Sequence, residues 1–276
     1  MHVVYSDAMV APAQGFSPSA AKPAAVVAAW RAAWPHLAFR EPVPVGVADF
    51  YRAHEPSHVD AVLALKVPNG FGTRSPEVNA SLPFTSGALL TAARWALSAH
   101  TAVAAPVSGF HHAGYASSVA YCTFNGLMVT ALALQIERPG LRIGILDYDY
   151  HYGDGTDDIL ERLKPPGIVH ITAGETWIRP EQANAFLAET PRHLEVMADC
   201  DLVLYQAGAD PHIDDPLGGF LTTTQMAQRD WRVFNGLKER GIPVAWVLAG
   251  GYQTPIAKVI DLHVNTMRAV LAAHSS

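Results

Sequence analysis

Short runs of β-branched and aliphatic residues recur through the second half of the chain, and stretches of helix length separate them. The four apolar runs are Arg142–Leu146, Ile168–Thr172, Leu202–Gln206 and Val244–Leu248. The stretches of helix length that follow the runs are Gly155–Leu163, Glu181–Met197, Thr223–Arg240 and Ala257–Ala273. Apolar strands that alternate with helices predict βαβ units, in which helices cover both faces of a parallel sheet.

The first half of the chain is expected to be richer in helices. A short apolar strand is predicted at His2–Tyr5. Helices are predicted at Ala24–Trp34, Ser57–Leu65, Ser86–His100 and Gly126–Ile136. The segment Pro68–Pro83 is dense in Pro, Gly, Asn and Ser, which predicts a long binding or lid loop. Since no repeat or shift in composition divides the chain, residues 1–276 are expected to form a single catalytic domain.

Composition narrows the class of protein. The chain has 276 residues, and 50% of them are apolar, which is enough for a sizeable core and excludes disorder or collagen-like structure as a description of the whole. Lys and Arg number 19 against 25 Asp and Glu, a formal net charge of −6. Because no basic excess exists to neutralise phosphates, we expect neither nucleic acid nor an anionic membrane as a partner.

Cysteine usage suggests the compartment. Cys122 and Cys200 are the two cysteines, and neither belongs to a CxxC pair, which excludes a disulfide framework or a zinc knuckle. The chain also begins without a basic segment followed by a long apolar one, as a secretory signal would have. Pro, Gly, His and Asn interrupt the longest uncharged stretch, so no membrane span is expected. We therefore expect a cytoplasmic protein.

Polar residues gather where the predicted strands end, which is where parallel α/β folds bind ligands. Asp147, Asp149 and His151 are spaced by two residues, so an extended segment would point them to one side. Asp210, which follows the next strand but one, completes a set of three ligands for a divalent metal such as Zn²⁺ or Fe²⁺, with a position left open for water. The alternative is a polar loop whose acids cap the next helix.

Two further features could take part in acid–base chemistry. His111 and His112 are adjacent in a turn flanked by glycines, and imidazoles titrate near neutrality. Either could be oriented by a carboxylate, for which Asp147 and Asp154 are available. The alternative is a pair of surface histidines. The turn Gly250-Gly251-Tyr252 would let the backbone approach a ligand and present a phenol beside it.

Taken together and in this order, these segments resemble the histone deacetylase superfamily, which includes bacterial deacetylases and acetylpolyamine amidohydrolases. The matching segments are His111-His112-Ala113, Leu146–Gly155, Gln206–Asp210 and Gly250-Gly251-Tyr252. The resemblance implies an arginase/deacetylase-like, three-layer α/β/α fold with a central, mainly parallel eight-stranded sheet.

The resemblance also implies roles for individual residues. The implied ligands of a Zn²⁺ (or Fe²⁺) ion are Asp149, His151 and Asp210. The implied catalytic groups are His111 with Asp147, His112 with Asp154, and Tyr252 as the phenol that polarises the scissile carbonyl. A structural K⁺ ion would take carbonyls of Asp147, Asp149 and His151, the Asp147 carboxylate and the Thr172 hydroxyl. The expected substrate contacts are Phe110, Ala120 and Tyr121.

The chain departs from the family pattern at several positions. Tyr152 replaces a frequent second histidine, and Ala120 and Ala249 replace frequent glycines. The loop that carries the opposite tunnel wall is not recognisable in Ala173–Pro180, where Trp177 would either form the wall or serve packing. These departures bear on acyl-chain preference more than on the reaction.

The function implied is metal-dependent hydrolysis of an N-acyl amide, such as acetyl-lysine or an acetylpolyamine, in a small molecule or peptide. One alternative is an acyl-amine binding protein that keeps the metal site without turnover. Another is an arginase-like ureohydrolase, which needs a second acidic cluster of the DxDxxDP kind, and Asp214-Asp215-Pro216 is the nearest approach. The sequence leaves open the oligomeric state and which histidine acts as the base.

Overall fold

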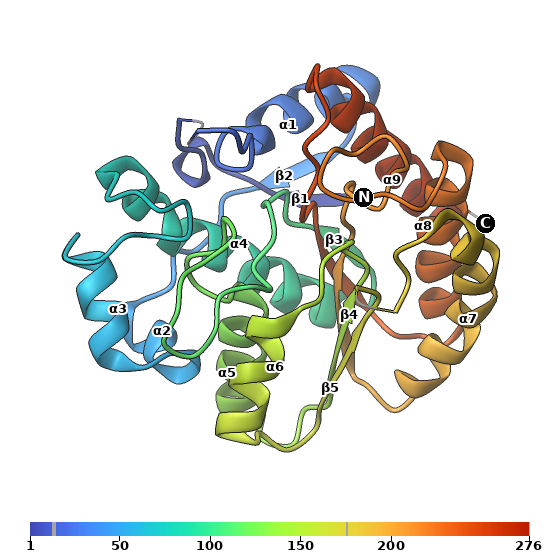
Figure 1. Ribbon diagram of the computed structural model, residues 1–276. Helices are drawn as coiled ribbons and strands as arrows, with labels where there is room; N and C mark the ends of the chain where they lie inside the picture. The colour runs from blue at the N-terminus through green and yellow to red at the C-terminus, as the bar shows by residue number, and fades with distance from the viewer. Residues whose placement is uncertain (13–14, 175, 276) are drawn as a thin grey trace.

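The computed structural model describes residues 1–12, 15–174 and 176–275, and a parallel β-sheet runs through its centre (Figure 1). Within those residues the sheet has seven strands in the order β2-β1-β3-β7-β6-β4-β5, and every pairing is parallel. The strands are β1 His2–Val4, β2 Ala38–Arg40, β3 Ala102–Ala104, β4 Ile143–Asp147, β5 Ile168–Thr172, β6 Leu202–Gln206 and β7 Val244–Val247. The expected parallel sheet is confirmed, with seven described strands where eight were expected.

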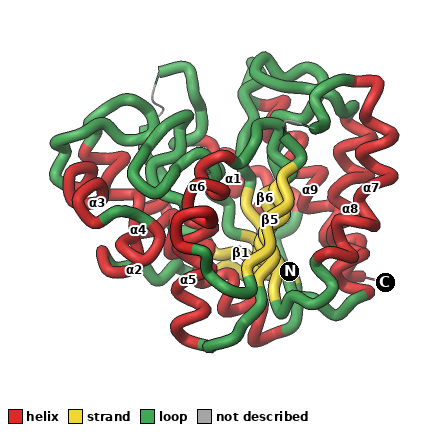
Figure 2. Tube along the Cα trace, turned by 60° about the horizontal axis from the view of Figure 1, so that its bottom comes forward, coloured by secondary structure: helices red, strands yellow, loops and turns green. Residues whose placement is uncertain are grey.

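Helices cover both faces of this sheet, so the molecule has three layers (Figure 2). One face carries α1 Lys22–Ala33, α7 Ala183–Val196, α8 Thr223–Glu239 and α9 Ala257–Ser275, which pack on one another. The other face carries α2 Val47–Ala53, α3 Pro56–Leu63, α4 Pro76–Ala99, α5 Gly126–Glu137 and α6 Asp154–Leu163. Two short 3₁₀ turns, η1 Asp7–Met9 and η2 Pro180–Gln182, complete the described elements. No helix in the described ranges has both the length and the apolarity needed to cross a membrane.

The strands of the second half lie where the apolar runs predicted them. Every residue of β4, β6 and β7 is buried, which explains why these segments are continuous apolar runs instead of alternating ones. The predicted helices of this half are also present, within two residues of their predicted bounds. Two three-residue strands, β2 and β3, and the seven-residue helix α2 were not predicted.

The prediction of a loop over Pro68–Pro83 was wrong in its second half, because α4 begins at Pro76. Ser75 caps this helix by accepting the Val78 N–H at 3.2 Å, and Pro76 occupies a first-turn position that needs no N–H donor. Pro83 lies inside the helix, where its carbonyl accepts the Val45 N–H at 3.0 Å. Burial of a long apolar face of α4 therefore outweighs the helix-breaking tendency of Pro83.

Strand register brings the polar residues to one edge of the sheet. Asp147, the last residue of β4, is opposite Thr172 of β5 on one side and Gln206 of β6 on the other. Gln206 is in turn opposite Val247 of β7. The loops that follow β4, β6 and β7 therefore leave the sheet side by side, and these are the loops with the acidic, histidine and glycine motifs.

Candidate metal centre

Asp149, His151 and Asp210 converge at the carboxyl edge of the sheet. One ligand atom from each lies within 4.8 Å of the others, and both carboxylates are buried. His151 Nδ1 is 3.0 Å from Asp210 Oδ2 and 3.2 Å from Asp149 Oδ1. The three side chains thus face one point from two neighbouring strand ends, where a single ion could contact all of them.

The orientation of His151 is fixed from its other ring nitrogen. Nε2 is 3.0 Å from the carbonyl oxygen of Leu217. Because a carbonyl can only accept, Nε2 carries the hydrogen, and Nδ1 faces the two carboxylates. A ligating histidine is commonly held in this way by a second partner.

Gly250 completes the floor of the cluster. Its N–H donates to Asp149 Oδ2 at 2.8 Å. A Cβ atom at this position would lie 2.2 Å from Asp210 Oδ2 and 2.8 Å from Asp149 Oδ2. Only glycine lets the backbone come this close to both carboxylates.

The charges of the cluster favour a cation. Burial and the neighbouring charge of Asp149 raise the pKa of Asp210 above the ordinary carboxyl range. Burial lowers the pKa of His151, but hydrogen bonds to Asp149 and Asp210 outweigh it and raise that pKa to about 11. Two buried carboxylates this close repel each other unless positive charge lies between them. One imidazole and two carboxylates are a donor set that suits Zn²⁺ or Fe²⁺, so the residues present fit such an ion.

Each histidine of the adjacent pair has a carboxylate partner. His111 Nδ1 donates to Asp147 Oδ2 at 2.7 Å, and His112 Nδ1 donates to Asp154 Oδ1 at 2.6 Å. Asp147 is itself held by Gln206 Nε2 at 3.0 Å. The two ring centroids lie 4.1 Å apart, and His111 Nε2 is 3.6 Å from Asp149 Oδ1 of the ligand cluster.

The two histidines differ in environment. His111 is buried, and although burial lowers its pKa, the charges of Asp147 and Asp149 raise it to about 9. His112 is partly exposed and lines the open cavity described below. Burial, followed by the nearby charge of His111, lowers the pKa of His112 below its ordinary value. The fold therefore shifts the two pKa values in opposite directions, upward for the buried His111 and downward for the partly exposed His112.

Tyr252 faces the same cavity from the loop after β7. Its backbone N–H donates to Asp215 Oδ2 at 2.8 Å. Burial, followed by the charges of Asp210 and Asp149, raises the pKa of Tyr252 far above its ordinary value, so the phenol stays a hydrogen-bond donor. The turn before it is held by Lys22, whose buried Nζ donates to the carbonyls of Ala249 at 2.5 Å and Gly250 at 3.2 Å.

A cavity of about 480 Å³ opens onto these groups. Aromatic rings form part of its wall, with ring centroids 5.7 Å apart for Tyr121 and Tyr252 and 5.8 Å apart for Phe71 and Tyr121. Ala120 and Tyr121 both line it and both have positive φ values, 47° and 67°. The departure from glycine at Ala120 therefore falls where the backbone is left-handed, and the same holds for Ala249 with φ 55°.

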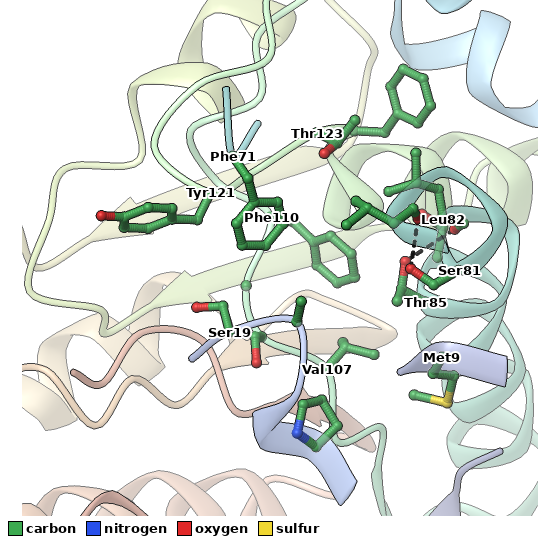
Figure 3. A pocket seen from close by; sticks show the side chains of 17 residues that line it. Met9, Ser19, Phe71, Ser81, Leu82, Thr85, Val107, Phe110, Tyr121 and Thr123 are labelled. Atoms are coloured by element: carbon green, nitrogen blue, oxygen red, sulfur yellow. Dashed lines mark hydrogen bonds between the residues drawn. The ribbon is translucent and has the colours of Figure 1, made fainter. Parts of the chain in front are cut away.

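A second, more apolar cavity adjoins the first and shares Phe71 and Tyr121 with it (Figure 3). Phe110 lines this second cavity and does not line the first. Trp177 lines neither of them; its ring packs on Phe186 with centroids 5.9 Å apart, which is the packing alternative for this residue. Glu175, in the same segment, lies outside the described residues.

The residues named for potassium surround the end of β4. Asp147 is opposite Thr172 in the sheet, and the Thr172 hydroxyl accepts the Gly153 N–H at 3.2 Å. His170 also approaches this place, with Nε2 4.0 Å from Asp147 Oδ2. The potassium ion remains a prediction.

Sequence reasoning missed several residues that hold the cluster. They are Lys22, His170, Asp215, Leu217 and Arg229. Lys22 carried a signal only as a charged residue within an otherwise apolar helix face, and Arg229 only as one of two adjacent charged residues on such a face. Cys122 is buried, and burial raises the pKa of its thiol to about 12, which agrees with an inert side chain.

Comparison with known proteins places these features in context. Residues 19–173 match the family model described as the histone deacetylase domain. An uncharacterised protein of Picosynechococcus sp. is 30% identical over 243 residues, which cover 78% of this chain and 79% of the relative. A probable deacetylase of Methanothermobacter thermautotrophicus is 24% identical over 254 residues, covering 78% and 74%. The crystal structure of the HDA15 HD domain superposes with a TM-score of 0.80 at 18% identity, covering 100% of this chain and 91% of that one, which shows a shared fold.

Proposed function

The chain belongs to the histone deacetylase family, and from that premise we propose that it is a metal-dependent deacetylase that removes an acetyl group from a primary amine, such as acetyl-lysine or an acetylpolyamine. Family membership by itself supports a hydrolase of the deacetylase class. The finer assignment rests on the site.

The observation that carries the proposal is the convergence of three kinds of group on one cavity. Asp149, His151 and Asp210 offer ligand atoms within 4.8 Å of one another. His112 and Tyr252 line the cavity beside them. An amide whose carbonyl lay over the ligand cluster would therefore have a proton acceptor and a hydrogen-bond donor within reach.

The metal site and Tyr252 would both polarise the carbonyl group of the substrate. A bound Zn²⁺ or Fe²⁺ ion would supply Lewis acidity toward the carbonyl and the attacking water. The Tyr252 hydroxyl donates to the carbonyl oxygen as negative charge develops there. Its raised pKa keeps the proton on the phenol while that charge forms.

The histidine pair moves the protons. His112 Nε2 accepts a proton from the attacking water, because this ring is neutral near pH 7 and faces the cavity. His111 keeps its proton and adds positive charge beside the developing oxyanion. His112 then returns a proton to the departing amine nitrogen, while Asp154 holds the ring in one tautomer.

Two alternatives from other classes predict different results from the main proposal. An acyl-amine binding protein would hold the metal without turnover, and a ureohydrolase would release urea from a guanidino substrate. The experiment combines metal analysis with hydrolysis of a fluorogenic acetyl-lysine amide, followed by acetyl-lysine peptides, acetylpolyamines and longer acyl amides. We expect about one equivalent of metal, and turnover that a chelator abolishes and Zn²⁺ restores. Bound metal without turnover of any acyl amine would instead identify a binding protein.

A pair of variants sharpens the result. Asp210→Asn removes one ligand charge and should lose both metal and turnover. Asp199→Asn removes an acidic side chain that is 85% exposed, and should leave both metal binding and turnover unchanged.

The proposal also includes a structural K⁺ ion near Asp147, a single domain over residues 1–276 and a cytoplasmic location.

A further inference from the structure

A buried guanidinium lies behind the two loops that carry the metal ligands. Arg229, in α8, is fully buried. Its Nη1 donates to the carbonyl of Tyr148 at 3.1 Å and to the carbonyl of Gly208 at 2.8 Å. Tyr148 directly precedes Asp149, and Gly208 is two residues before Asp210. One nitrogen thus contacts the backbone of both ligand-bearing segments.

The hydrogen bonds from Arg229 connect the two segments beyond the point where the pairing of β4 and β6 ends. The paired register of β4 and β6 stops at Asp147 and Gln206, and the Tyr148 N–H donates to the Gln206 carbonyl at 3.0 Å. Next along the β6 segment, the Ala207 N–H donates to Val247 of β7 instead. Arg229 bridges the two segments beyond this point, next to the residues whose side chains form the cluster.

Arg229 is itself held firmly from the other side. Its Nε donates to Asp230 Oδ1 at 2.8 Å. Asp230 also accepts the Tyr205 hydroxyl of β6 and the Thr266 hydroxyl of α9, each at 2.6 Å. The guanidinium is therefore fixed to the sheet and to a second helix, so its position can define that of the two carbonyls.

A contribution to stability does not by itself explain the buried ion pair between Arg229 and Asp230. Replacing a buried ion pair with apolar groups of similar volume is often neutral or stabilising. Arg229 Nη2 is also buried and has no hydrogen-bond partner among the described residues, which adds to the desolvation penalty. A pair retained at this cost next to the ligand loops points to a role in their geometry.

We propose that Arg229, anchored by Asp230, is a positioning residue that sets the spacing of Asp149 and Asp210 and so determines the affinity of the metal site. This inference rests on the metal site of the proposed function. It assigns no contact between Arg229 and the ion or the substrate.

The test separates positioning from folding by removing one charge and then both. Arg229→Met leaves Asp230 buried without its partner and should destabilise the protein strongly. The double variant R229M/D230N removes both charges and should regain much of that stability, as measured by urea unfolding of the metal-free protein. Its Kd for Zn²⁺, measured by competition with a chromophoric chelator, should remain 10–100-fold weaker than that of the unaltered protein, about the loss typical of groups that orient metal ligands.

Two further variants keep the test decisive if the double variant does not fold. Arg229→Lys keeps the charge but lacks the planar fork that reaches Asp230 and both carbonyls together, so its Kd for Zn²⁺ should also rise and its Co²⁺ absorption spectrum should change. Arg232→Met is the matched control: Arg232 is on the same helix and donates to the carbonyl of Leu187, away from the ligand loops. We expect it to bind Zn²⁺ like the unaltered protein.

The outcomes distinguish this inference from the proposed function. Unchanged Zn²⁺ affinity and Co²⁺ spectrum in the folded Arg229 variants would overturn the positioning role and leave the metal site intact. Failure of the unaltered protein to bind Zn²⁺ would overturn the metal dependence itself. Neither measurement requires turnover.

Discussion

Adding one methyl group at Gly250 should destroy the metal site without altering a ligand. A Cβ atom there would lie 2.2 Å from Asp210 Oδ2 and 2.8 Å from Asp149 Oδ2, where ordinary contacts begin at 3.4 Å. In Gly250→Ala the Asp210 carboxylate or the loop must therefore move by about 1 Å. Metal–ligand distances tolerate only about 0.2 Å, so at least one ligand should be lost.

The assay for Gly250→Ala is chelator competition for Zn²⁺ with the metal-free protein. We expect affinity to fall by about 100-fold or more, while the φ of this residue lies outside the left-handed region and imposes no backbone strain. Gly46→Ala is the control, because its Cβ would meet nothing closer than an Asp49 carboxylate oxygen at 3.8 Å. An alanine variant at position 250 that binds Zn²⁺ as tightly as the unaltered protein would refute the assignment of Asp149 and Asp210 as joint ligands.

Three more predictions concern the reaction and the fold. Tyr252→Phe should lower kcat about 10²–10³-fold, the loss that accompanies removal of one oxyanion donor, and near-normal kcat would remove the phenol from the mechanism. Because His112 must be neutral to accept a proton and its pKa is lowered, kcat/KM should fall only as pH drops below 6.5. In Asp154→Asn a carboxylate that raises this pKa is lost, so the acidic limb of the pH–rate profile should move to still lower pH; an unmoved limb would contradict His112 as the base. Ala120→Gly should stabilise the protein by about 1 kcal/mol in urea unfolding by relieving a left-handed alanine, and a loss of stability would show that this strain is absent.

How much could be predicted from the sequence depended on the length and burial of each element. The buried strand β6 and the half-buried strand β5 were located to the residue, because their apolar runs stand out between polar loops. The strands β2 and β3 have three residues each, too few for any period to be visible. In α4, proline content outweighed the apolar pattern in the prediction, whereas burial outweighs proline in the folded chain.

Within the site, the sequence indicated the residues on motifs but not those that support them from a distance. The carboxylates, the histidine pair and Tyr252 stand in short segments with recognisable spacing. Lys22 contacts Gly250 across 228 positions of sequence, and Arg229 contacts Tyr148 across 81. Such contacts form only when the helices pack on the sheet, so no local sequence pattern predicts them.

The histidine pair shows why a motif does not by itself assign roles. His111 and His112 are neighbours in sequence, each with one carboxylate partner, and the sequence left base and acid undecided. The fold makes them unequal: His111 is buried with a second carboxylate 3.6 Å from its Nε2, whereas His112 faces the cavity. Burial, followed by the neighbouring charge of His111, lowers the pKa of His112, which favours this ring as the proton acceptor near neutral pH. The different burial of the two rings thus assigns the role of base to His112, which the motif alone does not.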